Sequence, residues 1–166
     1  VVVTYNRKDL LKEGLQALLS SDYENNRILI VDNASTDGTS EMLTEYIDNR
    51  KVFYFNTGKN MGGSYGFSFG SKKAVEMGCD YVWLMDDDCI VKKDSLSKLV
   101  LFAQKKKDEF GYLSSKVLWK DESMCYMNIP KSDIAKRIKD YDRDQRICIA
   151  SFVSCFIKEK VIEEVG

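Results

Sequence analysis

The sequence predicts an α/β protein with a mostly parallel sheet and helices on both faces. Two observations support this: strand-like apolar runs alternate with segments of helical spacing from the first residue onward, and the links between them are short. Strand–helix–strand order with short links is typical of parallel sheets, because each helix carries the chain back across the sheet. A length of 166 residues suits one domain, residues 1–166.

The first third of the chain alternates strands and helices. Val1–Tyr5 is a short apolar, β-branched run, and leucines at helical spacing predict a helix over Lys8–Ser20. Arg27–Val31 is a second apolar run, followed by a helix with Tyr46 on its apolar face. Lys51–Phe55 predicts the third strand.

The middle of the chain continues the same alternation. A third helix is expected to end at Gly78, because glycine favours the left-handed conformation that closes helices. Tyr81–Met85 has the composition of a buried strand. Asp94 is a candidate N-cap for a fourth helix, which carries Leu99 on its apolar face.

The last third is less regular. Gly111–Trp119 and Ile147–Ile157 predict two further strands. Between them Lys120–Arg146 is polar and without a clean period, so we expect a surface excursion that can include a short helix. The chain opens inside a strand-like run and stops at a probable helix end at Gly166, so we expect a piece of a longer protein.

Composition limits the classes of ligand and location. The net charge of −1 provides no overall basic field for nucleic acid or an anionic membrane, so an anionic ligand would need a local binding device. Five scattered cysteines without histidine argue against a zinc site and indicate reduced thiols in a cytoplasmic protein. No apolar run approaches the ~20 residues of a membrane span. Peripheral attachment of the full-length protein to the inner face of the membrane stays open.

Four polar or glycine-rich clusters follow four of the predicted strands. They are Thr4–Arg7, Asp32–Asp37, Thr57–Gly63 and Asp86–Asp88. The carboxyl ends of parallel strands lie at one edge of a sheet, where α/β proteins bind their ligands. The sequence therefore predicts one site made from all four clusters.

The acidic triplet is the sharpest of these signals. Three adjacent carboxylates repel one another, so they need solvent or a cation. On an extended backbone Asp86 and Asp88 project to one side and Asp87 to the other. Oxygen ligands suit Mn²⁺ or Mg²⁺, which can bridge phosphates. The alternative is a solvated acidic turn that leads into the next helix.

Each of the other clusters has a ligand-binding interpretation and a structural one. Asp32 can accept hydrogen bonds from a base or ribose, or can form an Asx turn. The glycine-rich loop before the third helix can approach phosphate closely, although it matches no established phosphate-loop spacing. Tyr5 and Arg7 can stack on a base and contact phosphate, or can be ordinary surface residues.

In this order, VVVTYNR, ILIVDNASTDGT, NTGKNMGGSYGFSFG and YVWLMDDDC resemble the GT-A-fold (Rossmann-like) glycosyltransferases of family 2. NMGGSYGF and MDDDC look like its galactofuranosyltransferase and rhamnosyltransferase branch. The resemblance covers nearly the whole chain and implies a nucleotide-sugar-binding domain over residues 1–166. It implies inverting transfer from a nucleoside-diphosphate sugar, such as UDP-galactofuranose or dTDP-rhamnose, to a glycan or glycolipid.

The resemblance also implies roles for individual residues. Asp32 matches the carboxylate that reads the pyrimidine base, and Asp86 and Asp88 match the outer residues of the metal-binding Asp-x-Asp motif. The expected substrate-binding residues, with the middle aspartate of the triplet added, are Thr4, Tyr5, Arg7, Asp32, Asn60, Gly62, Gly63 and Asp87. The family's catalytic base and a metal-shell histidine are expected beyond Gly166.

Two other functions are open on the sequence. A metal-dependent nucleotidyltransferase would also use paired carboxylates, but it needs a basic residue in the glycine-rich loop, where Lys59 is the candidate. A non-catalytic nucleotide-sugar-binding module would keep the site without the transfer reaction. Donor hydrolysis that depends on Asp88 would separate an enzyme from such a module.

Overall fold

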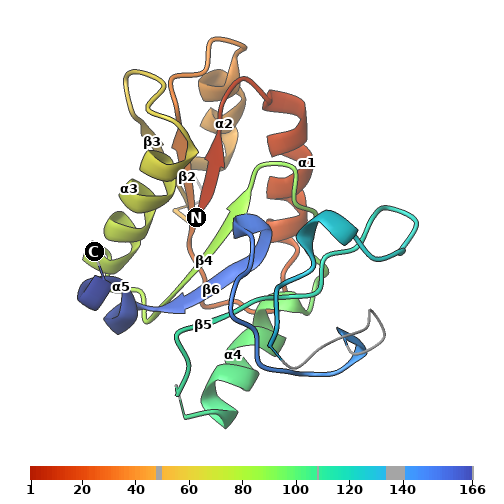
Figure 1. Ribbon diagram of the computed structural model, residues 1–166. Coiled ribbons are helices and arrows are strands. Elements are labelled where there is room, and N and C mark those ends of the chain that lie inside the picture. Colours follow the sequence, from red (N-terminus) through yellow and green to blue (C-terminus); the bar gives the residue numbers. More distant parts are fainter. Residues whose placement is uncertain (48–49, 108, 134–140, 166) are drawn as a thin grey trace.

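A six-stranded sheet with the order β3-β2-β1-β4-β6-β5 runs through the computed structural model (Figure 1), which describes residues 1–47, 50–107, 109–133 and 141–165. The strands are β1 Val2–Thr4, β2 Ile28–Asp32, β3 Val52–Asn56, β4 Tyr81–Asp86, β5 Tyr112–Leu113 and β6 Cys155–Lys158. The helices are α1 Lys8–Leu19, α2 Thr39–Ile47, α3 Gly63–Glu76, α4 Ser95–Lys105, α5 Glu159–Val165, and the short 3-10 helices η1 Tyr126–Asn128 and η3 Phe152–Ser154.

The strands β1 to β4 are parallel, as predicted. Thr4 pairs with Asp32 and Val3 with Asp86, so the carboxyl ends of β1, β2 and β4 lie level with one another. β6 is antiparallel to both β4 and β5, and is therefore the one reversed strand of the described sheet. The predicted α/β class with a mostly parallel sheet is confirmed.

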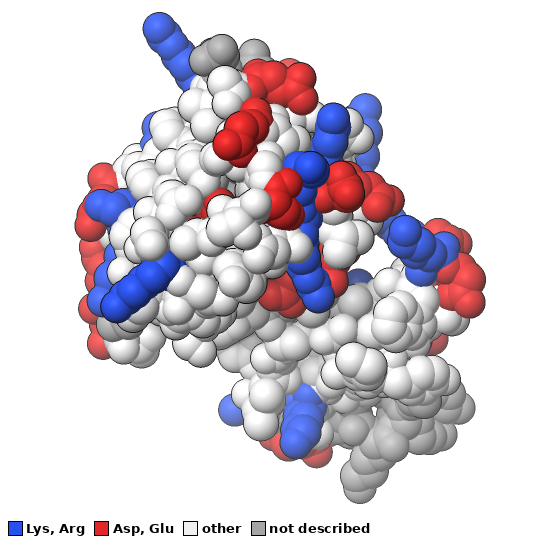
Figure 2. Space-filling view, turned by 90° about the horizontal axis from the view of Figure 1, so that it is seen from above, with Lys and Arg blue, Asp and Glu red and all other residues white. Residues whose placement is uncertain are grey.

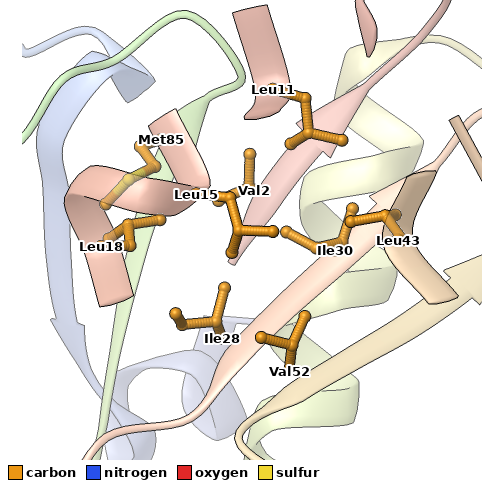
Figure 3. Close-up of a cluster of buried hydrophobic side chains, with 9 residues drawn as sticks. All are labelled: Val2, Leu11, Leu15, Leu18, Ile28, Ile30, Leu43, Val52 and Met85. Carbon is orange, nitrogen blue, oxygen red and sulfur yellow. The ribbon is translucent and has the colours of Figure 1, made fainter. Parts of the chain in front are cut away.

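One face of the sheet is covered by α1 and α2. Figure 3 shows the resulting apolar cluster, in which leucines of the two helices lie over alternate residues of the strands. Its buried members are Val2, Leu11, Leu15, Leu18, Ile28, Ile30, Leu43, Val52 and Met85. Burying side chains of this size stabilises the fold by about 1.5–3 kcal/mol each.

The opposite face is covered by α3 and α5. Their Phe67, Ala74 and Ile162 pack on a second cluster of strand residues. The strand residues are Val3, Leu29, Val31, Val82, Leu84 and Cys155. Because the two clusters use alternate residues of β1 and β2, those strands are buried on both faces, and the prediction of helices on both sides is confirmed.

Two glycines let α3 lie directly on the sheet. A Cβ at Gly66 would lie 2.6 Å from Val3 Cγ1, and one at Gly70 would lie 2.4 Å from Val1 Cγ1. No side chain fits in these gaps, so the helix backbone approaches β1 more closely than any other residue would allow. This contact fixes the start of α3 beside the carboxyl end of β1.

The second half of the chain departs from the predictions in detail. The predicted strand Gly111–Trp119 is only Tyr112–Leu113, because the chain then turns into a hairpin with a Leu118–Met124 bridge. The predicted run Ile147–Ile157 contributes only β6, preceded by η3.

The predicted surface excursion over 120–146 contains η1, whereas residues 134–140 lie outside the described residues. The predicted helix stop at Gly166 also lies outside them.

Two predicted helix ends can be compared with the structure. Gly78 follows α3 with a φ of +74°, as predicted. Asp94 is at the N-cap position of α4, but its side chain makes no cap hydrogen bond. Its carboxylate instead forms an ion pair with Lys98 at 2.6 Å. Within the ranges that the structure describes, no helix combines the length and apolar character needed to cross a bilayer.

Candidate functional site

The four predicted clusters converge at the carboxyl edge of the sheet, the upper edge in Figure 1. The strand register places three of them side by side. The fourth, the glycine-rich loop after β3, is joined to the end of β2 by a 3.3 Å hydrogen bond from Asn33 Nδ2 to the carbonyl of Gly62. Figure 2 is viewed from this side, and acidic and basic side chains lie next to each other on it. The prediction of one shared edge is confirmed.

The acidic turn after β4 is anchored to β1 through Asp87. This carboxylate is 4% exposed and accepts hydrogen bonds from Thr4 Oγ1 at 2.7 Å and Arg7 Nη1 at 3.2 Å. The same Arg7 nitrogen lies 3.0 Å from Oδ2 of Asp88. Thr4 is itself buried. These positions favour an anchoring role for Thr4 and Asp87 over the predicted substrate contacts.

Helix α1 packs against the backbone of the same turn. A Cβ at Gly14 would lie 3.1 Å from the carbonyl oxygens of both Asp87 and Cys89. On the other side, Cys89 Sγ lies 3.5 Å from the carbonyl of Val153 in η3. The turn is therefore held from two sides, and α1 leaves it little room to move.

Asp86 and Asp88 remain partly accessible at this turn. Burial raises the pKa of Asp86, and the neighbouring carboxylates of Asp88 and Asp87 raise it further, against the opposing effect of Arg7. Such a carboxylate gains from a nearby cation. Among the described residues no three acidic, cysteine or histidine side chains are grouped to hold a metal. β4 ends at Asp86 and Asp88 lies in the turn, so the two do not share the extended strand that the sequence predicted. Mg²⁺ commonly uses only one or two carboxylates together with water and substrate phosphates.

Asp32 is enclosed by groups of its own loop and of β3. It has no exposed surface, and its oxygens accept hydrogen bonds from Ser35 N at 2.8 Å and Tyr54 Oη at 2.7 Å. Burial, and then the bond to Asp32, raise the pKa of Tyr54 to about 12. A buried carboxylate with both oxygens bonded shapes the loop, so the structure favours the turn interpretation over contact with a base.

The glycine-rich loop is open at the start of α3. Gly62 has a φ of +82°, and no atom lies within 4 Å of a Cβ added at Gly62 or Gly63. Asn60 closes the turn with its Oδ1, which accepts a hydrogen bond from Gly62 N at 2.9 Å. The first turn of α3 has no side-chain cap, so its amides are available to a ligand. Tyr5, 45% exposed, lies at the same edge.

Two residues that the sequence interpretation did not single out hold the loops together. Asn33, next to Asp32, makes the bond to the glycine-rich loop. Asp37 accepts hydrogen bonds from Lys8 N at 2.9 Å and Thr39 N at 3.2 Å, and so caps both α1 and α2. The signal for Asp37 was its place one residue before a glycine and two before a helix, but its reach to α1 depends on the tertiary fold.

A mostly parallel sheet with an acidic turn and an open glycine-rich loop at the same carboxyl edge is the arrangement expected of the GT-A fold. The family model for glycosyl transferase family 2 matches residues 1–166. The chain therefore belongs to glycosyltransferase family 2, as its motifs predicted.

Solved structures show the same fold. The mannosyltransferase PcManGT from Pyrobaculum calidifontis, in complex with GDP-Man and Mn²⁺, superposes with a TM-score of 0.70 at 19% identity, over 99% of this chain and 45% of that one. S. aureus TarS 1–349 superposes with a TM-score of 0.73 at 18% identity, over 98% of this chain and 47% of that one. At these identities the likeness establishes the fold alone.

Curated relatives are similar over part of the chain. Galactofuranosyltransferase GlfT1 of Mycolicibacterium smegmatis is 35% identical over 88 residues, which are 53% of this chain and 28% of that protein. Abequosyltransferase RfbV of Salmonella typhimurium is 33% identical over 111 residues, 64% of this chain and 32% of that protein. The chain thus spans about a third of the length of these relatives.

Proposed function

We propose that this chain is the nucleotide-sugar-binding part of a metal-dependent, inverting glycosyltransferase. The observation that carries the proposal is the acidic turn at Asp86–Asp88, which lies at the same sheet edge as an open glycine-rich loop and an uncapped helix start. The donor would be a nucleoside-diphosphate sugar, similar to UDP-galactofuranose or dTDP-rhamnose. The acceptor would be a glycan or a glycolipid.

The turn supplies the ligands for a divalent cation. Asp86 and Asp88 would hold Mn²⁺ or Mg²⁺, and the raised pKa of Asp86 marks a carboxylate that benefits from a cation. When bound, such an ion neutralises charge on a departing diphosphate. Asp87 would keep the turn in place through Thr4, while α1 prevents the turn from receding.

The remaining donor contacts would come from two elements of the edge. The amides of Gly62, Gly63 and the following turn of α3 suit the diphosphate, because an uncapped helix start favours anions. The exposed ring of Tyr5 suits stacking on the base. Asn60 would shape the loop rather than bind the donor, since its side chain is bonded to Gly62.

Inverting transfer also needs a base that removes the proton of the acceptor hydroxyl. We place this base outside residues 1–166. Two of the three carboxylates of the acidic turn would hold the metal, the third is buried against Thr4, and the sequence contains no histidine.

Calorimetry tests the binding half of the proposal. UDP, UDP-galactofuranose and dTDP-rhamnose are titrated into residues 1–166 with Mn²⁺ and with EDTA. We expect binding at least tenfold weaker in EDTA, and the same loss in Asp88→Asn with Mn²⁺. Glu76→Gln is the matched control, because Glu76 lies at the opposite end of α3, roughly 20 Å from the loop. Equal affinity with and without metal would contradict the metal role.

Transfer assays test the catalytic half. The full-length protein is expected to transfer sugar, and residues 1–166 alone to be slower by about 10²–10⁴-fold, the usual loss on removing a general base. Comparable transfer by both would place the base within residues 1–166. Binding of donor without transfer or hydrolysis by the full-length protein would identify a non-catalytic module. Selective binding of nucleoside triphosphates would favour a nucleotidyltransferase.

A further inference from the structure

We propose that Arg7 is a resident counter-cation of the metal site, which releases Asp88 when a divalent ion binds and stays attached to Asp87. This inference rests on the proposed metal role of the acidic turn. To the phosphate contact expected of Arg7 from the sequence, it adds a role in positioning the acidic turn. Without a metal ion the guanidinium would hold the turn in shape through Asp87 and Asp88, and a bound ion would then replace it at Asp88.

Arg7 bridges Asp87 and Asp88, and the geometry of these contacts supports replacement by a metal ion at Asp88 only. A single nitrogen, Arg7 Nη1, lies 3.2 Å from Asp87 Oδ1 and 3.0 Å from Asp88 Oδ2. The Asp87 side chain is 5% exposed and also receives the Thr4 hydroxyl, so its end of the bridge is fixed. The Asp88 side chain is 48% exposed and that of Arg7 is 51% exposed. Water and ions therefore reach the Asp88 end alone.

The charges of the turn suit the same exchange. The three carboxylates of the turn, together with the Arg7 guanidinium bonded to Asp87 and Asp88, leave two negative charges, which one divalent cation neutralises. A metal ion that takes Asp86 together with Oδ2 of Asp88 displaces the guanidinium, because Oδ2 is the oxygen that Arg7 contacts. The freed guanidinium then adds a positive charge beside the ion, where a diphosphate would bind.

Two opposite effects on binding follow from this arrangement. Without nucleotide, Arg7 competes with the metal for Asp88, so its removal should tighten metal binding. With nucleotide, Arg7 assists the diphosphate, so its removal should weaken binding of the nucleotide to the metal-loaded protein. An exposed ion pair is worth up to about 1 kcal/mol, which corresponds to about fivefold in affinity.

The test measures Mn²⁺ binding directly, by the electron paramagnetic resonance signal of free Mn²⁺, in wild type, Arg7→Gln and Arg7→Lys. We expect Arg7→Gln to bind Mn²⁺ about two- to fivefold more tightly than wild type without nucleotide. At saturating Mn²⁺ it should bind UDP more weakly by a similar factor. Arg7→Lys should stay within about twofold of wild type, since one nitrogen makes both contacts.

The control is Lys12→Gln, which removes the same charge from an exposed position on α1 and should leave Mn²⁺ affinity within about twofold of wild type. Equal or weaker Mn²⁺ binding by Arg7→Gln, with wild type binding normally, would overturn the role of Arg7 alone. Absence of Mn²⁺ binding by every variant, with UDP present, would overturn the metal site itself. Thermal melting of each variant shows that it is folded, and Arg7→Ala, which also removes the positive charge, takes the place of Arg7→Gln if Arg7→Gln does not fold.

Discussion

The substitution Gly14→Ala tests whether α1 sets the position of the acidic turn. The added Cβ would lie 3.1 Å from the carbonyl oxygens of Asp87 and Cys89, both of them backbone atoms. Overpacking of this kind costs about 1–3 kcal/mol. Replacing glycine by alanine inside a helix stabilises the helix by about 1 kcal/mol. The net loss in the free energy of unfolding should therefore be about 0–2 kcal/mol.

The close contact between the new Cβ and the turn can lower either the stability of the protein or its affinity for Mn²⁺, and measuring both distinguishes the two cases. If α1 and the turn stay in place, urea denaturation should show the loss of stability and Mn²⁺ affinity should change little. If the turn moves by a few tenths of an ångström, stability is kept and Mn²⁺ binding weakens instead, because Asp86 and Asp88 are displaced. Gly63→Ala is the control for stability, since a Cβ there meets no atom within 4 Å. A Gly14→Ala protein as stable as Gly63→Ala, with unchanged Mn²⁺ binding, would refute the reasoning.

Three further substitutions probe contacts around the site. Ser154→Ala removes the oxygen that lies 2.9 Å from the indole nitrogen of Trp83, and should lower the free energy of unfolding by about 1–3 kcal/mol in urea titrations. Tyr54→Phe leaves one oxygen of the buried Asp32 without its donor, at a cost of about 1.5–3 kcal/mol. The pKa of Tyr54 is raised from 10.0 to about 12 in the folded protein, so its contribution to stability is present below pH 10 and is lost as the pH rises toward 12. The free energies of unfolding of wild type and Tyr54→Phe, plotted against pH, should therefore converge near pH 12. Parallel curves for the two proteins would contradict the pKa shift. Gly66→Ala places a Cβ 2.6 Å from Val3 Cγ1 and should lower both the melting temperature and UDP affinity, whereas a higher melting temperature would contradict the close packing of α3 on β1.

The fold and the location of the site follow from local patterns. Helical leucine spacing in α1 and short apolar runs at β1 and β2 predict the alternation of elements, and that alternation predicts parallel strands. Once the strands are parallel, residues directly after them must lie at one edge. The convergence of Thr4, Asp32 and Asp86 could therefore be predicted without coordinates.

Local patterns did not predict where the last strands end. β6 runs antiparallel to β4, and β5 is two residues long although the apolar run around it is longer. Two residues after β5 ends, Ser115 N donates a hydrogen bond to Ser154 Oγ at 3.3 Å instead of to a neighbouring strand, and these residues are 39 positions apart. Strand length in this region depends on such distant partners, and hydrophobic periodicity carries no information about them.

The sequence by itself determined which residue types stand at the site, and the tertiary structure decided what each of them does. Asp32 is buried, and one of its oxygens is satisfied by Tyr54, 22 residues away. Asp87 is an anchor because Thr4 and Arg7, 83 and 80 residues away, reach it from the first strand and the start of α1. A carboxylate at a strand end is equally suited to a ligand or to a neighbouring hydroxyl. Only the packing of distant elements decides which partner fills its hydrogen bonds, because a buried carboxylate has to be satisfied from within the protein.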